Sequence, residues 1–122
     1  SLQVVLEQPS SGDFTTIHVT KNAESIGCSE ASTVNGRAPL DVYNLNKNDV
    51  AFAFAGEIED PITLANLIAH IAGHTYGLRD SVDENDIMNP QPSLNMKGFA
   101  IANIVGQAEA QDGPSLLRSN IG

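Results

Sequence analysis

The sequence predicts a single α/β domain of the α+β kind, residues 1–122, in which a small twisted sheet packs against one long helix. Apolar residues alternate over 14–20 and 50–55, as is typical of strands, whereas 62–76 contains no helix breaker except Gly73. Of the 122 residues, 41% are hydrophobic and 17% are charged. This length and composition indicate one globular unit with its own core.

Two strands are predicted before residue 21. The stretch LQVVLEQ, residues 2–8, is an apolar run that fits a strand, and PSSGD after it fits a turn. The stretch FTTIHVT, residues 14–20, alternates and is rich in β-branched residues, which favours a second strand. The turn between them would allow the two strands to form a hairpin.

Residues 21–49 carry many Asn, Ser, Gly and Asp residues and are predicted to be the most irregular region. Within it, GRAPLDVYN (36–44) can hold a short extended segment, which Pro39 restricts to a sheet edge or a bulge. The stretch DVAFAFAG (49–56) is predicted to be a strand with valine and phenylalanine on one face. Its other face carries only alanines, so another element is expected to pack closely over it.

The helix over 61–76 is the best-defined element. Asp60 is a good N-cap, Pro61 suits the first helical position, and Gly77 suits the C-terminal cap. Most of the circumference is apolar, so the helix is expected to be largely buried. A narrow polar arc comprises Thr63, Asn66, His70, Gly73 and His74. Ile71 falls at the margin of the apolar arc, which predicts a place at the rim of a cleft.

The C-terminal third is predicted to be mostly loop, with one short helix. RDSVDENDIMNPQPS (79–93) is rich in turn residues and has two prolines. MKGFAIANIVGQAEA (96–110) is apolar and fits either a helix or strands. DGPSLLRSN (112–120) fits a terminal helix, with Pro114 in its first turn.

Charge and cysteine content exclude some classes of partner and structure. The formal net charge of -9, with only six Lys and Arg, argues against nucleic acid or an anionic membrane as a partner. No apolar run reaches the ~20 residues that span a bilayer, and no basic-then-apolar leader is expected. Cys28 is the only cysteine, which excludes an internal disulfide. It could be a metal ligand or a reactive thiol, but an incidental or buried thiol is the better interpretation.

The stretch AHIAGHTYGLRDS, residues 69–81, places two histidines four residues apart. On a helix, His70 and His74 project from one face and can converge on one metal ion. Gly77 permits a sharp turn, after which Asp80 can return as a third ligand. Two histidines and one carboxylate leave a coordination position open for water. The alternative is that both histidines line a solvated polar face without metal.

These residues, followed by DIMNP with Met88 in a tight turn, resemble the metzincin clan of zinc metalloproteases, particularly its matrixin-like members. The close match covers residues 69–90. The resemblance implies a metzincin-like fold with a small, twisted and mostly parallel sheet, a long active-site helix, a Met-turn and a C-terminal helix. It also implies a secreted or extracytoplasmic protein that holds a peptide or protein in its cleft.

The resemblance further implies a set of site residues. One zinc ion would be bound by His70, His74 and Asp80. Gly77 would make the turn after the helix, and Met88 would form the hydrophobic base beneath the metal.

One departure from the family pattern bears on activity. In the family a glutamate follows the first histidine and takes a proton from zinc-bound water, and here that position holds Ile71. Isoleucine cannot accept a proton, which implies an inactive or weak peptidase; natural loss and deliberate replacement of the glutamate both fit. The sequence places no nearby acidic residue on the water, whether Glu57, Glu59, Asp83, Glu84 or Asp86. For His18 and Tyr76, surface or packing roles are expected rather than ligation or oxyanion support.

Three functional hypotheses remain from the sequence. The first is a matrixin-like zinc metallopeptidase domain that uses zinc-bound water but is inactive or weak in this chain. The second is a non-catalytic, zinc-containing pseudoprotease that acts as a peptide- or protein-binding module. The third is a structural domain without metal. The sequence does not determine the oligomeric state.

Overall fold

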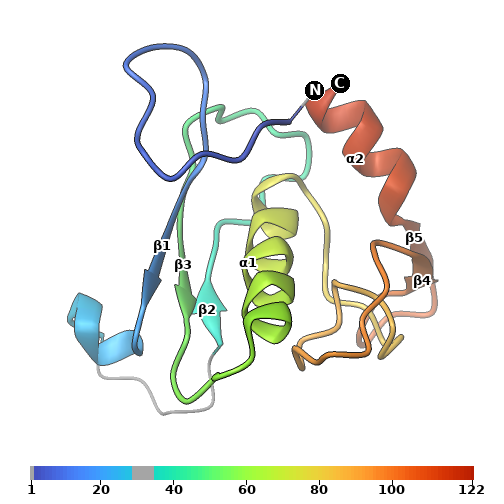
Figure 1. Ribbon diagram of the computed structural model, residues 1–122. Coiled ribbons are helices and arrows are strands. Elements are labelled where there is room, and N and C mark those ends of the chain that lie inside the picture. The colour runs from blue at the N-terminus through green and yellow to red at the C-terminus, as the bar shows by residue number, and fades with distance from the viewer. Residues whose placement is uncertain (1, 29–34) are drawn as a thin grey trace.

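The computed structural model describes residues 2–28 and 35–122; residues 29–34 of the region predicted to be irregular lie outside the described residues. The elements follow in the order β1 (Thr16–Thr20), the 3-10 helix η1 (Ala23–Ile26), β2 (Gly36–Arg37), β3 (Val50–Phe54), α1 (Pro61–Thr75), β4 (Ile101–Asn103), β5 (Ala110–Asp112) and α2 (Gly113–Ile121). Figure 1 shows α1 between the sheet of β1, β2 and β3 and the C-terminal segment that carries β4, β5 and α2. The fold is therefore α+β, as predicted.

The main sheet has three strands in the order β1–β3–β2. β1 is parallel to β3, with Thr16 opposite Val50, and β2 is antiparallel to β3, with Gly36 opposite Ala53. The strands predicted within 14–20 and 49–56 are confirmed, and the short extended segment after residue 35 is an edge strand. The sheet is mixed, and its longer pairing is the parallel one.

The strand predicted over residues 2–8 is wrong. These residues form no strand, and Leu6 is fully exposed. β1 pairs with β3 instead, so the two predicted N-terminal strands do not form a hairpin. In Figure 1 the N-terminal segment is a long loop that leads into β1. A β-prone apolar run becomes a strand only where a neighbouring strand edge faces it, and local sequence does not supply that edge.

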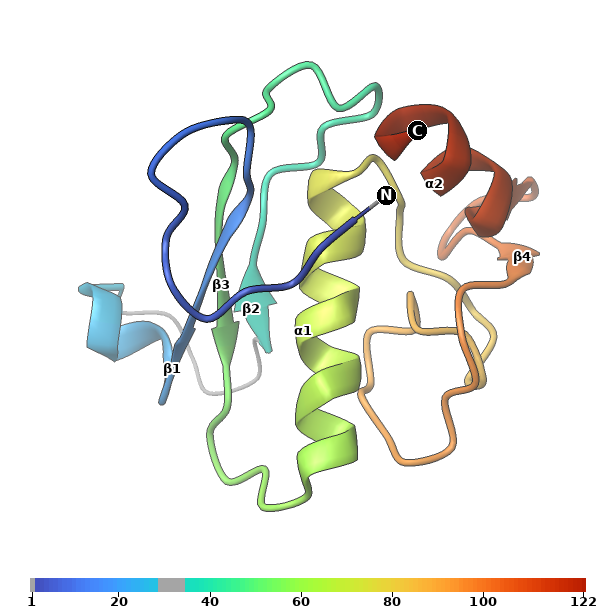
Figure 2. The same cartoon turned by 45° about the horizontal axis from the view of Figure 1, so that its top comes forward.

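The core lies between the sheet and α1. Ala51 and Ala53 of β3 are fully buried and pack with Leu67 and Ile71 of α1. The alanine face thus receives a closely packed neighbour, as predicted, because its small side chains let the helix approach the sheet; Figure 2 shows α1 lying along the strands. The expectation that Ile71 lies at the rim of a cleft is confirmed, because this residue lines a pocket beside α1. Its side chain is 3% exposed, because the sheet covers α1 on that side.

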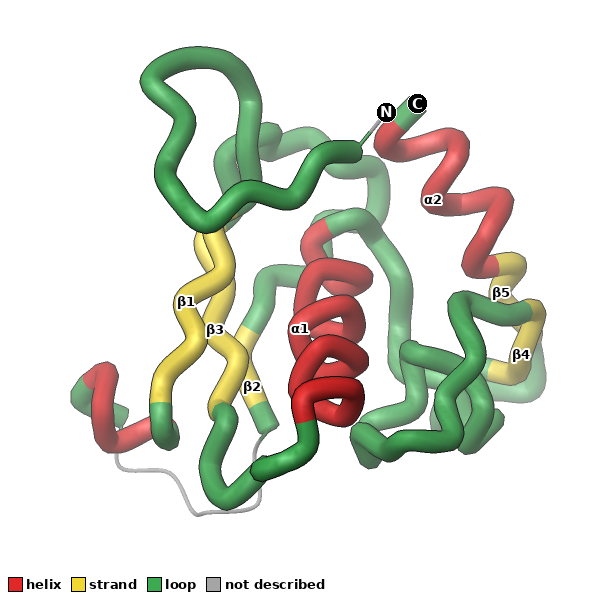
Figure 3. Tube along the Cα trace, viewed as in Figure 1, coloured by secondary structure: helices red, strands yellow, loops and turns green. Residues whose placement is uncertain are grey.

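The polar arc of α1 faces the loop that follows the helix rather than solvent. Asn66 donates a hydrogen bond from Nδ2 to the carbonyl of Ser93 at 2.8 Å, and Met88 is fully buried beside Gly73. Figure 3 shows that this C-terminal part of the chain is mostly loop. α1 is therefore covered by the sheet and, along its polar arc, by the loop that carries the Met-containing turn.

The ambiguous stretch 96–110 contributes strands. β4 and β5 form an antiparallel pair in which Ala102 lies opposite Gln111. α2 follows directly, with the Asp112 side chain accepting a hydrogen bond from the Ser115 amide at 3.0 Å, so the predicted terminal helix is confirmed. Among the described residues, no helix has the length and apolar character needed to cross a membrane.

Replacing Gly73 by Ala is expected to destabilise the fold. A Cβ at this position would overlap the Met88 sulfur and approach a Phe99 ring carbon to 3.2 Å. Overpacking of this kind costs about 1–3 kcal/mol, which outweighs the gain of about 1 kcal/mol in helix propensity. Urea denaturation of the metal-free protein would measure the free energy of unfolding. An unchanged or higher midpoint would mean that Met88 moves aside at no cost.

Candidate metal centre

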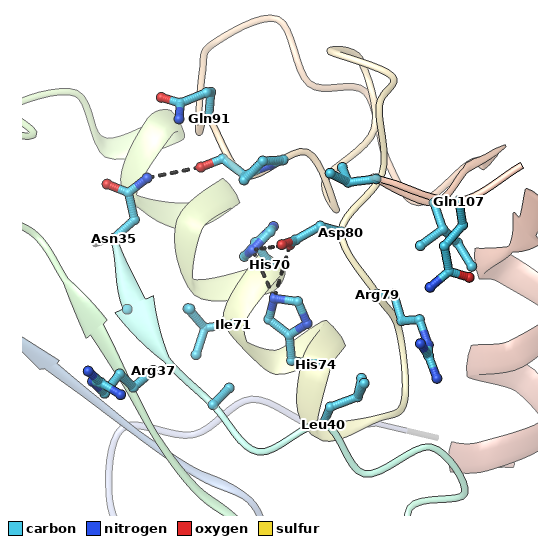
Figure 4. A pocket seen from close by; sticks show the side chains of 15 residues that line it. Asn35, Arg37, Leu40, His70, Ile71, His74, Arg79, Asp80, Gln91 and Gln107 are labelled. Atoms are coloured by element: carbon cyan, nitrogen blue, oxygen red, sulfur yellow. Dashed lines mark hydrogen bonds and ion pairs between the residues drawn. The ribbon is translucent and has the colours of Figure 1, made fainter. Parts of the chain in front are cut away.

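Three side chains from α1 and the loop after it converge on one point. The Nε2 atoms of His70 and His74 lie 3.1 Å apart, and Asp80 Oδ1 lies 3.4 Å and 3.3 Å from them (Figure 4). Ligand atoms at the corners of a tetrahedron about a zinc ion, with bonds of about 2.0–2.1 Å, are roughly 3.3 Å apart. The predicted triad is therefore assembled with separations that fit a metal ion, and these residues could hold one.

The outer nitrogen of each imidazole fixes which tautomer is present. His70 Nδ1 lies 2.9 Å from the carbonyl oxygen of Ile87, and His74 Nδ1 lies 2.8 Å from that of Leu78. A carbonyl oxygen only accepts, so each Nδ1 carries a proton and each neutral ring turns an unprotonated Nε2 inwards. Asp80 Oδ1 is buried and has no well-oriented hydrogen-bond donor among the described residues. Three lone pairs therefore face one another, and they are mutually repulsive unless a proton or a cation lies between them.

The charges of the three groups are coupled. Burial lowers the pKa of His70, and the neighbouring His74 lowers it further. Burial also disfavours charge on His74, but the Asp80 carboxylate and the Leu78 carbonyl outweigh this effect and raise its pKa. The contact with His74 in turn lowers the pKa of Asp80 against the effect of burial. Without metal, a His74 imidazolium paired with the Asp80 carboxylate is the favoured charged state.

Metal affinity is expected to rise with pH. A raised pKa means that the His74–Asp80 ion pair stabilises the metal-free fold below the ordinary histidine pKa and is lost as pH rises through the raised value. A metal ion must displace the His74 proton, so metal binding at low pH releases that proton. At higher pH the proton is already lost, and metal binding no longer includes the free-energy cost of removing it. Calorimetric titration with zinc in buffers of different ionisation enthalpy would count the protons. Affinity independent of pH between 6 and 8 would contradict the charge state given above.

The turn after α1 places the third ligand. Gly77 has a φ of 93°, a conformation that closes the end of the helix with two hydrogen bonds. The Leu78 amide donates to the Gly73 carbonyl at 2.9 Å, and the Gly77 amide donates to the His74 carbonyl at 3.0 Å. A side chain at Gly77 would also meet the Val42 carbonyl oxygen at 2.5 Å, so glycine is required twice over. The predicted turn residue is therefore confirmed in position and conformation.

Sequence reasoning missed the residue that holds the loop at Asp80. Gln111 of β5 accepts a hydrogen bond from the Arg79 amide at 3.0 Å and donates one to the Arg79 carbonyl at 2.5 Å. Gln111 is buried, and both bonds fix the backbone directly before the ligand. It lies 32 residues from Arg79 in a stretch with no motif, so no sequence signal could have found it.

Asp86 organises the turn that carries Met88. It is 1% exposed, and its Oδ1 accepts hydrogen bonds from the amides of Met88 at 3.0 Å and Ala100 at 3.3 Å. Met88 is fully buried against α1 at Gly73, which lies between the two histidines in the sequence. The sequence predicted the methionine turn, whereas Asp86 was assigned no role at the site.

The triad opens into a pocket of about 750 Å³. Ile71 and Gly36 line one wall, and Pro90 and Gln91 line another, with Asn35 Nδ2 donating to the Pro90 carbonyl at 3.0 Å between them (Figure 4). Asp80 is the only carboxylate among the described residues that line this pocket. Apart from that candidate ligand, this described lining offers no carboxylate that could act as a general base.

The other sequence candidates are not brought to the triad. His18 is exposed and stacks on Phe52, with ring centroids 5.3 Å apart. Tyr76 is the C-cap of α1, and Cys28 is partly exposed and outside the metal-binding cluster. The acidic residues weighed from the sequence do not line the pocket: Glu57, Glu59, Asp83, Glu84 and Asp86.

Comparisons with protein-family models, curated proteins and solved structures found no match to this chain.

Proposed function

We propose that the chain is a matrixin-like zinc domain that binds one zinc ion at His70, His74 and Asp80, holds a peptide in the adjoining pocket, and hydrolyses it weakly or not at all. The observation that carries the proposal is the convergence of the two imidazole Nε2 atoms and the buried Asp80 Oδ1 atom, which lie 3.1–3.4 Å from one another. The glycine turn at Gly77 and the buried Met88 beside α1 add support for the family.

Each residue of the site has a definite task in this proposal. His70 and His74 hold their ligand atoms inwards through hydrogen bonds to backbone carbonyls, which sets ring orientation before metal binding. Asp80 adds one negative charge as the third ligand. With three protein ligands, a bound metal ion would keep its fourth coordination position for water or a ligand in the pocket. A zinc ion there supplies Lewis acidity towards a bound water or carbonyl.

The lack of a proton acceptor favours binding over hydrolysis. Ile71 occupies the position of the family glutamate, and its side chain both belongs to the core and lines the pocket. Besides the three proposed ligands, the described residues of the pocket lining include no group that could take a proton from a metal-bound water and pass it to an amine leaving group. The two hypotheses, a weak peptidase and a peptide-binding module, therefore share the same metal site. They differ only in whether a group at the site can accept a proton from water.

Zinc is expected to stabilise the chain without being required for folding. The core between Ala51, Ala53 and Leu67 does not include the ligands, so α1 remains packed without metal. Binding to the native state alone adds roughly 2.7 kcal/mol at a hundredfold excess over Kd. Thermal unfolding followed by circular dichroism, with zinc and with chelator, measures the effect. A chain that is unfolded in chelator would contradict this expectation.

The metal itself is tested by analysis of the purified protein. Elemental analysis after loading and desalting should give about one zinc per chain, as three protein ligands with an open fourth position require. Because two histidines and one carboxylate also suit Fe²⁺, the loading should be repeated with zinc and Fe²⁺ in competition. Only trace metal after loading with zinc would reject the proposal.

A further inference from the structure

The pocket beside the triad differs in charge from the rest of the molecule. The chain has 15 Asp and Glu but only six Lys and Arg. Among the described residues that line the pocket, Asp80 is the only acid, and Arg79 lies directly beside it in the sequence. A divalent ion on the triad would offset the charge of Asp80. An anion beside Arg79 would then meet no uncompensated carboxylate among the described lining residues.

Arg79 is well placed to recognise an anion. Its backbone amide and carbonyl are both held by Gln111, so the base of the side chain is fixed directly beside Asp80. The residue is exposed, and no ion pair among the described residues involves its guanidinium. Figure 4 shows Arg79 on the opposite side of His74 from Ile71. A guanidinium in such a position can bind a carboxylate through two parallel hydrogen bonds.

The rest of the lining fits a peptide better than a small inorganic anion. Asn35, Gln91 and Gln107 offer amide donors and acceptors that suit a peptide backbone, and Ile71, Leu40 and Ile104 offer apolar contacts. A volume of about 750 Å³ is much larger than a phosphate ion needs and lies in the range of organic ligand pockets. The net charge of -9 disfavours a long polyanion such as nucleic acid, which would extend beyond the pocket.

We infer that the pocket selects acidic peptides, with a carboxylate of the peptide paired to Arg79; this rests on the proposed function. A free carboxylate can pair with the guanidinium while the metal site and the amide side chains bind the remainder of the peptide. A bidentate pair between a guanidinium and a carboxylate is expected to favour an acidic peptide over a neutral one by about tenfold.

Fluorescence anisotropy on the zinc-loaded protein tests the inference. Three pools of labelled octapeptides would share the same random apolar positions and carry Glu, Gln or Lys at the others. The Glu pool should bind about tenfold more tightly than the Gln pool and more tightly still than the Lys pool. The preference should weaken with added salt, because the guanidinium is exposed.

Two arginine variants separate Arg79 from general charge. Arg79→Gln should remove the preference for the Glu pool while the zinc content stays at that of the parent chain. Arg118→Gln makes the same change in net charge on α2, where Arg118 bonds Ser115, and should keep the preference. A preference that survives Arg79→Gln or is lost in Arg118→Gln would overturn the assignment to Arg79.

The remaining outcomes separate this inference from the proposed function. If zinc is retained and all three pools bind equally, the charge selection is wrong and the zinc and peptide-binding functions stand. If zinc is retained and no pool binds, both the charge selection and the peptide-binding function are wrong, and the metal site alone stands. If zinc is not retained, the proposed function and this inference both fail.

Discussion

His74→Ala is expected to reduce the zinc content from about one ion per chain to trace. The side chain supplies one of three converging ligand atoms, and it lies 3.1 Å from His70 Nε2 and 3.3 Å from Asp80 Oδ1. Two remaining ligands give only a weak site, because structural and catalytic zinc sites use at least three protein ligands. Elemental analysis after desalting measures the loss, and circular dichroism checks that the variant is folded.

His18→Ala is the matched control for that experiment. It removes one histidine from an exposed position on β1, where the ring stacks on Phe52. His18 does not belong to the cluster that could hold the metal ion. Its zinc content should equal that of the parent chain. Full retention of zinc by His74→Ala, or equal loss in both variants, would show that the metal binds elsewhere.

Ile71→Glu is expected to create peptidase activity that the parent chain lacks. Residue 71 lines the pocket between the two histidines in the sequence, so a carboxylate there can face a water on the metal. A positioned general base contributes on the order of 10² to 10⁴ in rate. Cleavage of casein and of fluorogenic peptides, with chelator controls, measures the gain. Chelator-sensitive cleavage by the parent chain would mean that another group already serves as the base.

The same substitution also has a structural cost. Ile71 is 3% exposed and packs with Ala51, Ala53 and Leu67, so replacing it removes about 1.5–3 kcal/mol of apolar burial. Ile71→Gln is therefore the control, since it has the same size as glutamate and a similar cost in burial but no basic carboxylate. If Ile71→Glu is folded, binds zinc and is no faster than Ile71→Gln, the pocket lacks more than a base for catalysis.

The local parts of the site could be predicted from the sequence, and the non-local parts could not. The limits of α1 follow from Asp60 and Gly77, which act on backbone groups within a few residues of themselves. The spacing of His70, His74 and Asp80 follows from the helix and its turn. Each of these interactions spans only a few positions, which is why composition and spacing were sufficient.

The errors concern contacts between distant segments. The run 2–8 has strand propensity but no adjacent strand edge, and propensity alone cannot reveal this. The helical projection placed Ile71 at the margin of the apolar arc, but its close contact with β2 and β3 depends on where those strands lie. The hold of Gln111 on Arg79 joins segments 32 residues apart. These features arise when the chain folds back on itself, and no single stretch encodes them.

Gly36 and Ile71 constrain each other's evolution. A Cβ on Gly36 would overlap the Ile71 side chain and meet the Phe52 carbonyl oxygen at 2.5 Å, so the edge strand can lie this close to α1 only while residue 36 is glycine. A smaller residue at 71 would relieve only the first of these two overlaps, because the second is with backbone, so a larger residue at 36 would also require β2 to move away from β3. A proton acceptor introduced at 71 would need a stem that keeps the narrow contact with residue 36. The close approach of β2 to α1 therefore limits which side chains position 71 can accept, and substitutions at the two positions should be read together rather than site by site.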